Sequence, residues 1–449
     1  MISRQRLVVI GGTAAGASAA AKARRVNGEL EIVVLEKSGF VSYGSCGLPY
    51  LISGVVPNHH RLIARTPEEF SRGGIQVRTR NEVTQIDTQR RVVEVRDLER
   101  DVVFELAFGR LIVASGAAAL RPSVAGGDLQ GIFTLRTIED GLAIQRWLAH
   151  HHPRRAVVVG GGYIGLEMAE AFRARGLEVF VVEMLPHLMP NIDADMSTLI
   201  REELERQGVT VSLGNRVEGF VGTDRVGAVR TQEGDIPTEV VMLGIGVRPN
   251  VTLAQSAGLA LGPTGALSVD DHQRTGVQGV FAAGDVVESK HVVTGKPAYV
   301  PLGSTANKQG RVAGINAAGG DAHFSGIVGT AVVKVFDLEV ARTGLSEGEA
   351  RREGYVVRTT KIGHPSAGHY MPDPTPLHVK LIYEDRTERL LGAQMVGRRG
   401  AAKRIDVLAA ALHGGWTLEE VSRLDLGYAP PFAPVWDPIL VACNVARQD

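Results

Sequence analysis

The sequence is poor in cysteine, and this alone excludes several classes of protein. Only Cys46 and Cys443 occur among 449 residues, and they lie far apart in the chain. Neither has a CxxC partner, which excludes a disulfide-built scaffold and a cysteine-ligated zinc site. Such sparing use of cysteine is typical of a cytoplasmic protein, and we predict that location.

Net charge, long apolar runs and aromatic residues are also lacking. Lys plus Arg and Asp plus Glu each total 49, so the composition favours neither nucleic acid nor an anionic membrane surface as a partner. No apolar run reaches the roughly 20 residues that span a membrane. Aromatic residues make up only 5%, whereas glycine is abundant with 54 residues, which indicates tight turns and close backbone contact with a ligand.

One pattern occurs twice in the chain: a β-branched strand, a glycine-rich turn, a helical stretch and a second strand ending in glutamate. Continuous apolar strands of this kind are typical of a parallel sheet buried on both faces, and each repeat has the length of a βαβ unit. The sequence therefore predicts two nucleotide-binding folds and leaves about 120 residues for a third unit. The two copies occupy residues 7–36 and 156–183, and the third unit begins near Asp321, with a strand in 326–335 and an amphipathic helix in 401–412.

The second copy contains a complete dinucleotide fingerprint. Gly160, Gly162 and Gly165 fit G-x-G-x-x-G, in which glycine lets backbone N–H groups approach a pyrophosphate. Glu183 follows 18 residues later, where a carboxylate accepts from a ribose 2′-OH. No arginine follows before Arg201 to bind a 2′-phosphate. We therefore expect NADH to be preferred over NADPH.

The first copy departs from the fingerprint at one position. It reads Gly11, Thr13 and Gly16, with threonine in place of the middle glycine, and Glu36 ends the following strand. Much later in the chain, a short apolar strand ends in Gly-Asp at Asp285, where a carboxylate can bond the hydroxyls of a ribityl chain. Two further strands end in turns at Ser115-Gly116 and at Gly246.

Together these features resemble the flavin-dependent pyridine nucleotide-disulfide oxidoreductases over essentially the whole chain. The resemblance implies an α/β fold like that of glutathione reductase, with two Rossmann-like domains and a C-terminal α+β dimerisation domain. It places the first part of an FAD-binding domain at 1–118, an NAD(P)H-binding domain at 119–250, the second FAD-binding part at 251–322 and the dimerisation domain at 323–449. It also implies cofactor contacts from Glu36, Lys37, Val83, Ser115, Gly116 and Asp285 for FAD, and from Tyr163, Ile164 and Gly246 for the nicotinamide nucleotide.

The segment from Val41 to Tyr50 contains the candidate nucleophile, Cys46. Glutathione-reductase relatives carry a second cysteine five positions earlier, where this chain has Val41, so no internal redox disulfide can form. A single cysteine must form a mixed disulfide with its substrate or become a sulfenate. We expect a helix N-terminus to lower its pKa and make it nucleophilic; the alternative is a small buried apolar residue.

Within the family, the chain is most similar to the coenzyme A-disulfide reductases, in the segments 42–50, 403–408 and 428–432. NADH oxidases and peroxidases usually have histidine where this chain has Ala14, which disfavours a dedicated peroxidase. The reductases often have asparagine where this chain has Ser45, so the substrate stays open. The alternatives are a polysulfide or CoA-persulfide reductase, an NADH oxidase, and a redox sensor without turnover.

The resemblance also implies a homodimer with shared active sites, in which Tyr370 and Tyr428 of one chain reach the cysteine of the other. The basic and aromatic candidates for CoA contact each have an alternative interpretation. These are a solvated helix face for Lys22 and Arg25, dimer salt bridges for Lys403 and Arg404, and core packing for Trp436. The remaining candidates that line the CoA channel are Ser18, Ser42 and Ser45. We expect no metal; His150, His151 and His152 are interpreted as a solvated helix end before Pro153.

Overall fold

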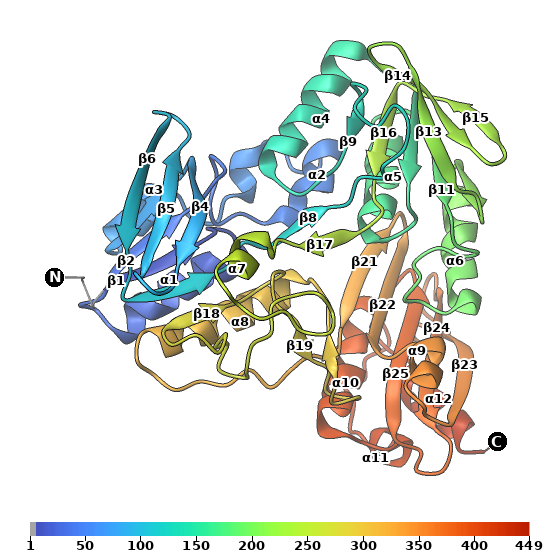
Figure 1. The fold of residues 1–449 in the computed structure, drawn as a ribbon. Coiled ribbons are helices and arrows are strands. Elements are labelled where there is room, and N and C mark those ends of the chain that lie inside the picture. The colour runs from blue at the N-terminus through green and yellow to red at the C-terminus, as the bar shows by residue number, and fades with distance from the viewer. Residues whose placement is uncertain (1–5, 449) are drawn as a thin grey trace.

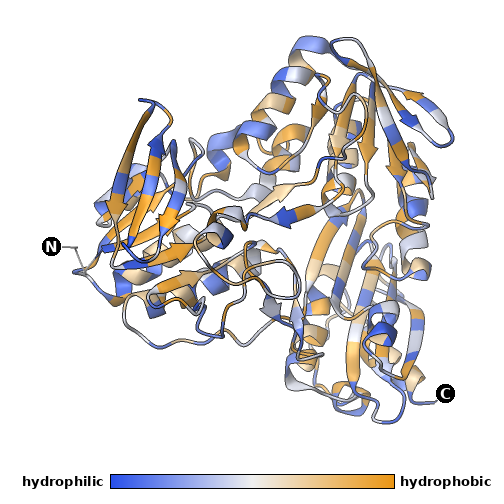
Figure 2. Ribbon diagram, in the orientation of Figure 1, coloured by the Kyte–Doolittle hydropathy of each residue, from blue (hydrophilic) through white to orange (hydrophobic). Residues whose placement is uncertain are grey.

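A computed structural model describes residues 6–448 as three sheet-based units packed together (Figure 1). Two five-stranded sheets are wholly parallel, and a third is wholly antiparallel. This arrangement confirms the predicted fold class. Figure 2 shows hydrophobic residues running along the strands, while hydrophilic residues gather on helix surfaces and hairpin ends. Within residues 6–448, no helix combines the length and the apolar character needed to cross a membrane.

The first parallel sheet has the order β18-β7-β1-β2-β3. Strand β18 comes from far along the chain, so the first unit is interrupted by the second and then completed. Helix α8 (Gly303–Ala317) packs closely on α1 (Ala14–Val26), which follows the first glycine turn. The strands of this sheet are β1 (Arg6–Ile10), β2 (Glu31–Leu35), β3 (Ile75–Arg78), β7 (Arg110–Val113) and β18 (Val280–Ala282).

The second parallel sheet repeats this arrangement with the order β12-β11-β10-β16-β9. Helix α5 (Tyr163–Ala174) begins directly after the second glycine turn and packs on β10 and β11. Helix α4 (Ile138–His151) ends where the histidine run before Pro153 predicts a helix end, and the residue after it, His152, is exposed and left-handed. The strands are β9 (Ile132–Phe133), β10 (Arg155–Val159), β11 (Glu178–Glu183), β12 (Val209–Leu213) and β16 (Val240–Leu243), and helix α6 (Ala194–Arg206) precedes β12.

Small antiparallel sheets and short helices connect and cover the two parallel sheets. The antiparallel pair β8–β17 forms the crossing between the first two units, since β8 leads out of the first and β17 leads back. The crossing strands are β8 (Ala117–Ala119) and β17 (Val247–Pro249); the others are β4 (Asn81–Asp87), β5 (Val92–Asp97), β6 (Val102–Ala107), β13 (Val217–Gly222), β14 (Val226–Thr231), β15 (Gly234–Pro237), β19 (Ser289–Lys290) and β20 (Pro297–Ala298). The short helices are α2 (Leu48–Ser53), α3 (Pro67–Arg72) and α7 (Thr252–Ser256).

The C-terminal unit is an antiparallel sheet with the order β21-β22-β25-β24-β23, covered by α10 and α12. The predicted helix at 401–412 is confirmed, but the strand expected from residue 326 begins only at Ala331. Gly326 and Gly329 both have positive φ, which breaks the extended conformation before that point. The elements are β21 (Ala331–Val335), β22 (Leu338–Gly344), α9 (Glu347–Arg352), β23 (Val357–Pro365), β24 (Pro376–Glu384), β25 (Leu390–Gly397), α10 (Ala401–Gly414), α11 (Leu418–Ser422) and α12 (Pro438–Ala446).

Candidate active site and nucleotide loops

Two glycines make the turns after β1 and β10 possible. Gly11 has φ +97°, and a Cβ there would lie 2.2 Å from the carbonyl oxygen of Ala114. Gly160 has φ +100°, and its Cβ would lie 2.6 Å from the carbonyl oxygen of Gly244. Any side chain would clash with a neighbouring strand end, so the backbone itself lines both turns. The N–H groups of Gly11 and Gly160 donate to the carbonyls of Leu35 and Val182, so a phosphate would bind the N–H groups at the start of the following helix.

A glutamate closes each turn in the same way. Glu36 accepts from the backbone N–H of Gly12 at 2.7 Å and from that of Ser38 at 2.8 Å. Burial raises the pKa of its carboxyl, opposed by these two hydrogen bonds. Glu183 accepts from the backbone N–H of Gly161 at 2.7 Å and from that of Leu185 at 2.9 Å. The predicted ribose acceptors therefore also hold their loops in shape.

The third positions of the two turns differ, as the sequence indicates. Thr13 and Gly162 are the residues before α1 and α5, and a Cβ at Gly162 would meet nothing closer than 3.9 Å. The position therefore tolerates a side chain, which explains how threonine fits there. After the second turn, the Tyr163 hydroxyl accepts from Asn191 at 3.1 Å, and Ile164 is exposed. A nucleotide could lie against this exposed start of α5.

The last glycine of each fingerprint allows the helix to approach the strand. A Cβ at Gly16 would lie 1.8 Å from the carbonyl oxygen of Gly11, and one at Gly165 would lie 2.0 Å from that of Gly160. Both contacts are far shorter than van der Waals distance. The first and last glycines of each fingerprint are therefore required by packing as well as by any ligand.

The remaining predicted FAD contacts lie around the first turn. The hydroxyl of Ser115 donates to the carbonyl of Asn250 at 3.0 Å, and Asn250 donates back to Ser115 at 2.8 Å, so the crossing strands are locked together. Gly116, which follows, has φ +68°, and Gly246, at the other side of the crossing, has φ +107°. At the adenine side, Lys37 pairs with Glu82 at 2.6 Å, next to half-buried Val83.

Asp285 follows β18 and forms an ion pair that the sequence did not indicate. Its carboxylate lies 2.9 Å from the guanidinium of Arg136, which precedes α4. Its backbone carbonyl accepts from the hydroxyl of Tyr299 at 2.9 Å. The predicted ribityl acceptor is thus held by residues from two distant segments.

The loop that carries Cys46 is attached to the first glycine turn. The backbone N–H of Ser42 donates to the carbonyl of Gly12 at 2.8 Å, and Ser42 has φ +48°, which is unusual for a residue other than glycine. The N–H of Gly44 donates to the carbonyl of Leu62 at 2.9 Å. Ser45 and Cys46 are exposed, so the alternative of a buried apolar cysteine is wrong for Cys46.

The surroundings of Cys46 raise its pKa, contrary to the expectation that a helix N-terminus would lower it. Cys46 lies in a short 3-10 turn (Ser45–Gly47) ahead of α2, not at the start of a long helix. Protein around the sulfur raises the thiol pKa by desolvation, and the Glu167 carboxylate raises it further; Arg136 and a hydrogen bond from Ser45 oppose them. The protein groups thus favour the neutral thiol over the thiolate.

Glu167 and Arg136 are the two site residues that sequence reasoning missed. Glu167 lies on α5, four residues after Tyr163, and α2 packs against both α4 and α5. Burial and the neighbouring Glu170 raise the pKa of Glu167 to about 7. An acidic residue one helical turn after the glycine fingerprint was a visible signal for Glu167. Arg136 offered no comparable signal.

Three of the predicted CoA contacts on the first unit lie on helix α1, whereas Ser42 and Ser45 lie on the Cys46 loop. Ser18 donates to the side chain of Asn307 on α8, and half-buried Lys22 and exposed Arg25 follow one and two turns later. Lys22 and Arg25 are three residues apart and place two cations on one face of α1.

The predicted catalytic tyrosines lie together, but on a different unit from Cys46. The hydroxyls of Tyr370 and Tyr428 are 3.1 Å apart, and both side chains are exposed. The hydrogen bond with Tyr370 raises the pKa of Tyr428. They belong to the C-terminal unit, whereas Cys46 precedes α2 beside α4 (Figure 1).

Arg404 holds the segment that carries these aromatic residues. It pairs with Asp437 at 2.8 Å and donates to the backbone carbonyls of Phe432 at 2.7 Å and Ser366 at 3.2 Å. Lys403, next to it, pairs with Asp406 at 2.7 Å and is otherwise exposed. These partners are in the same chain, so Arg404 acts here by positioning a loop.

Trp436 and Cys443 have opposite environments. Trp436 is 59% exposed, so core packing within its own chain is wrong as an interpretation. Cys443 is fully buried among apolar residues of the C-terminal unit, and desolvation raises its pKa to about 12. This agrees with its prediction as a core residue.

The charges around Cys46 predict opposite effects of two substitutions. Glu167→Gln removes a negative charge and is expected to lower the thiol pKa, whereas Arg136→Gln removes a positive charge and is expected to raise it. The rate of Cys46 alkylation by iodoacetamide, measured against pH in the flavin-loaded protein, gives both midpoints. Since Glu167 has a pKa of about 7, its influence is complete only above that pH.

Glu178→Gln is the matched control, because Glu178 is an exposed carboxylate at the start of β11. Its midpoint should equal that of the unsubstituted chain. Shifts of the same sign in the two test variants would show that Glu167 and Arg136 do not act on the sulfur through their charges.

Comparison with known proteins identifies related sequences and structures along nearly the whole chain. The NAD(P)H sulfur oxidoreductase (CoA-dependent) of Pyrococcus abyssi is 40% identical over 446 residues, covering 99% of this chain and 98% of the relative. The coenzyme A disulfide reductase of Staphylococcus epidermidis is 31% identical over 431 residues, covering 95% and 96%. The structure of an NAD-dependent persulfide reductase from A. fulgidus matches with a TM-score of 0.96 and 38% identity, covering 99% of this chain and 83% of the other.

One family model covers both parallel sheets, and a second covers the antiparallel C-terminal sheet. The pyridine nucleotide-disulphide oxidoreductase model matches residues 5–310, and the dimerisation domain of the same family matches residues 330–438. The two matches include both glycine turns and the antiparallel C-terminal sheet. The chain therefore belongs to the pyridine nucleotide-disulphide oxidoreductase family and is an oxidoreductase.

Proposed function

We propose that this chain is a flavin-dependent reductase that uses NAD(P)H to reduce CoA disulfide at Cys46. The observation that carries the proposal is the position of this cysteine, exposed on a loop that is hydrogen-bonded to the first glycine turn. The names of the Pyrococcus and Staphylococcus relatives support CoA as part of the substrate. A thiol next to the turn that would bind FAD is placed to pass electrons from the flavin to a sulfur substrate.

The residues present fit FAD at the first turn and a nicotinamide nucleotide at the second. The positive-φ glycines leave room for backbone contact with a pyrophosphate, and Glu36 and Glu183 lie where each ribose would bind. Asp285 would meet the ribityl chain, and Tyr163 and Ile164 would cover the nicotinamide side. When bound, FAD takes two electrons from NAD(P)H and supplies them to sulfur.

Cys46 performs the disulfide exchange. Its thiolate attacks one sulfur of CoA disulfide, forms a Cys46–CoA mixed disulfide and releases the second CoA as a thiolate. Two electrons then cleave the mixed disulfide, which releases the remaining CoA thiolate and restores the Cys46 thiolate. One NAD(P)H and one proton are consumed for two CoA thiols formed. Ser18, Lys22, Arg25, Ser42 and Ser45 are proposed to line the CoA channel.

A second candidate uses the same machinery with a persulfide. The Pyrococcus relative is named for sulfur and the A. fulgidus protein for persulfide, which favours a CoA persulfide or polysulfide as an alternative substrate. In that case attack of the Cys46 thiolate on the inner sulfur of CoA persulfide forms the Cys46–CoA mixed disulfide and releases hydrosulfide. Attack on the outer sulfur forms a Cys46 persulfide and releases the CoA thiolate, and two electrons then reduce either product. The relative kcat/KM for CoA disulfide and CoA persulfide distinguishes the two substrates.

Cys46→Ser tests the proposed function directly. This variant is expected to retain FAD and to undergo flavin reduction by NADH, because both nucleotide turns stay intact. Turnover of CoA disulfide should fall by at least about 10³-fold, because a serine hydroxyl cannot form the mixed disulfide. Anaerobic flavin bleaching and NADH consumption with CoA disulfide measure the two steps.

Cys443→Ala is the matched control, since it removes the other cysteine from the buried core. It should lose some thermal stability and keep CoA-disulfide reduction. Undiminished CoA-disulfide turnover by Cys46→Ser would show that Cys46 is not the nucleophile. Absence of flavin bleaching by NADH in the unsubstituted protein would favour a redox sensor without turnover.

NADH is proposed to be the preferred electron donor. Glu183 would face the ribose 2′-OH with a carboxylate, and exposed Met184 follows it where a cation would be needed for a 2′-phosphate. The kcat/KM for NADH should exceed that for NADPH by about tenfold or more, since a carboxylate repels the phosphate. Met184→Arg should lower the ratio of kcat/KM for NADH to that for NADPH. A higher kcat/KM for NADPH in the unsubstituted protein would contradict the role of Glu183 as acceptor for the ribose 2′-OH.

Each active site is proposed to combine two chains of a homodimer. Tyr370 and Tyr428 are exposed on the dimerisation domain, far from Cys46 along the fold. A phenol can hold a thiolate in place or donate to a departing CoA thiolate. Lys403 and Trp436 are proposed to contact CoA from the same partner surface, and Arg404 holds that surface in shape.

A mixed dimer tests the shared site. Cys46→Ser chains are dissociated and reassembled with Tyr370→Phe/Tyr428→Phe chains, each nearly inactive alone. If the tyrosines act across the two-fold axis, one site of each mixed dimer is wild type, and about a quarter of all sites should recover. CoA-disulfide turnover of the reassembled mixture is the measurement. No recovery beyond the sum of the separate variants would place the tyrosines with their own chain's cysteine.

A further inference from the structure

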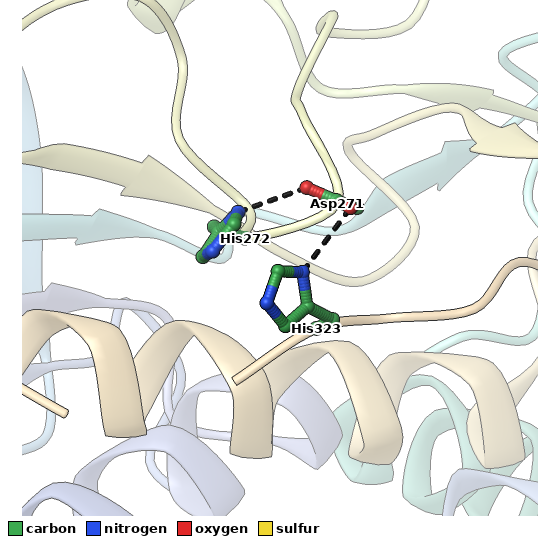
Figure 3. A group of neighbouring side chains, drawn as sticks. All are labelled: Asp271, His272 and His323. Carbon is green, nitrogen blue, oxygen red and sulfur yellow. Dashed lines mark hydrogen bonds and ion pairs between the residues drawn. The ribbon is translucent and has the colours of Figure 1, made fainter. Parts of the chain in front are cut away.

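A group of histidine and aspartate side chains lies outside the proposed active site. Asp271 and His272 belong to the loop before β18, and His323 follows α8, about 50 residues later in the chain. One ligand atom from each lies within 4.8 Å of those from the other two. Figure 3 shows both imidazole rings turned toward the Asp271 carboxylate.

The distances within this group are those of a compact cluster. The two Asp271 oxygens lie 2.8 Å from Nδ1 of His272 and 3.2 Å from Nδ1 of His323. On the other side, one oxygen of Asp321 lies 3.0 Å from Nε2 of His272 and 3.8 Å from Nε2 of His323. Neighbouring ligands around a tetrahedral zinc ion are separated by about 3.3 Å, given bonds of about 2.0–2.1 Å.

A buried asparagine holds the two segments in this arrangement. Asn316, near the end of α8, donates to the backbone carbonyls of His272 at 2.8 Å and Ala322 at 2.9 Å, and accepts from the N–H of Ala322 at 2.8 Å. The N–H of Phe324 also donates to the carbonyl of Asp271 at 2.8 Å. The backbone on both sides of the cluster is therefore fixed by bonds that do not involve the cluster's own side chains.

The Nδ1 atoms of both rings face the same Asp271 carboxylate, and the ring centroids are 3.9 Å apart. A neutral imidazole with its proton on Nε2, the side on which Asp321 lies, directs its Nδ1 lone pair toward Asp271. A divalent cation between these atoms would accept lone pairs from both imidazoles and from the carboxylate.

We propose that Asp271, His272 and His323 bind a divalent transition-metal ion of the Zn²⁺ class. Two imidazoles and a carboxylate are a donor set that zinc takes up, and the exposed rim leaves a fourth position for water. His272 is the least exposed ligand, with 17% of its side chain accessible, and it anchors the site.

The ion would act as a clamp between two parts of the chain. The loop before β18 belongs to the first sheet, while the segment after α8 leads into the dimerisation domain. Binding would join these two segments, which contain none of the residues proposed for the active site or the glycine turns. The expected role of the ion is therefore to stabilise the fold.

The test uses untagged, FAD-loaded protein carrying Cys46→Ser, which removes a competing thiol. After chelator treatment and dialysis, Zn²⁺ binding is measured by equilibrium dialysis and by calorimetry. About one Zn²⁺ per chain is expected, together with a rise in the thermal midpoint. His272→Ala and His323→Ala should each weaken binding by about tenfold or more and abolish that rise. Asp271→Asn should act in the same direction, since it removes the negative charge.

The double variant His150→Ala/His151→Ala is the matched control, because it removes two adjacent histidines at the end of α4 and should leave Zn²⁺ binding unchanged. Unaltered FAD content in every variant shows that the fold is intact. Failure of the Cys46→Ser protein to bind Zn²⁺ at about tenfold molar excess would overturn the proposal, leaving a hydrogen-bonded clasp only. Equal binding by the His272 and His323 variants would overturn it as well.

Discussion

The structure depends on one repeated interaction, a glutamate carboxylate that closes a glycine turn from the neighbouring strand. In each parallel sheet, both oxygens of the glutamate accept backbone N–H groups, one from the turn and one from the residue two positions after the glutamate. Charge-assisted bonds of this kind are the stronger ones in proteins, and here they are largely shielded from water. The turn is therefore shaped before any nucleotide arrives, so that binding costs little ordering.

A further backbone hydrogen bond attaches a neighbouring loop to each turn. In the first unit, Ser42 donates to the carbonyl of Gly12; in the second, Met189 donates to that of Gly161. Both donors lie six residues after their glutamate and have nearly equal positive φ, +48° and +49°. The two copies thus share even a strained backbone position, and in the first copy this strain aims the segment that ends at Cys46. The segment that carries Cys46 therefore begins with the same backbone arrangement as the loop that follows Glu183 in the second unit.

Much of this architecture was predictable from the sequence because it is local. The fingerprints, their strands and the terminal glutamates follow one another within about 30 residues, and periodicity alone indicates the helix at 401–412. Interactions between distant segments were not predictable. The pKa of Cys46 rises because surrounding protein desolvates the sulfur and Glu167 approaches it from α5, while Arg136, just before α4, opposes the rise. Asp271 meets His323 where Asn316 bridges their two loops. The strand predicted in 326–335 begins only at Ala331, because the alternating pattern does not reveal that Gly326 and Gly329 adopt positive φ. The residue boundaries of the domains stay a prediction.

The C-terminal unit carries a surface that a lone chain cannot keep in water without cost. Phe432, Val435 and Trp436 are each more than half exposed and lie within five residues of one another. Contiguous apolar surface of this kind promotes aggregation when it is left uncovered. In the proposed homodimer, folding and assembly are coupled by mass action, and resistance to unfolding increases with the concentration of chains. Chains of that dimer at low abundance would be the most vulnerable to proteolysis and misassociation, because their apolar surface stays uncovered until two copies meet.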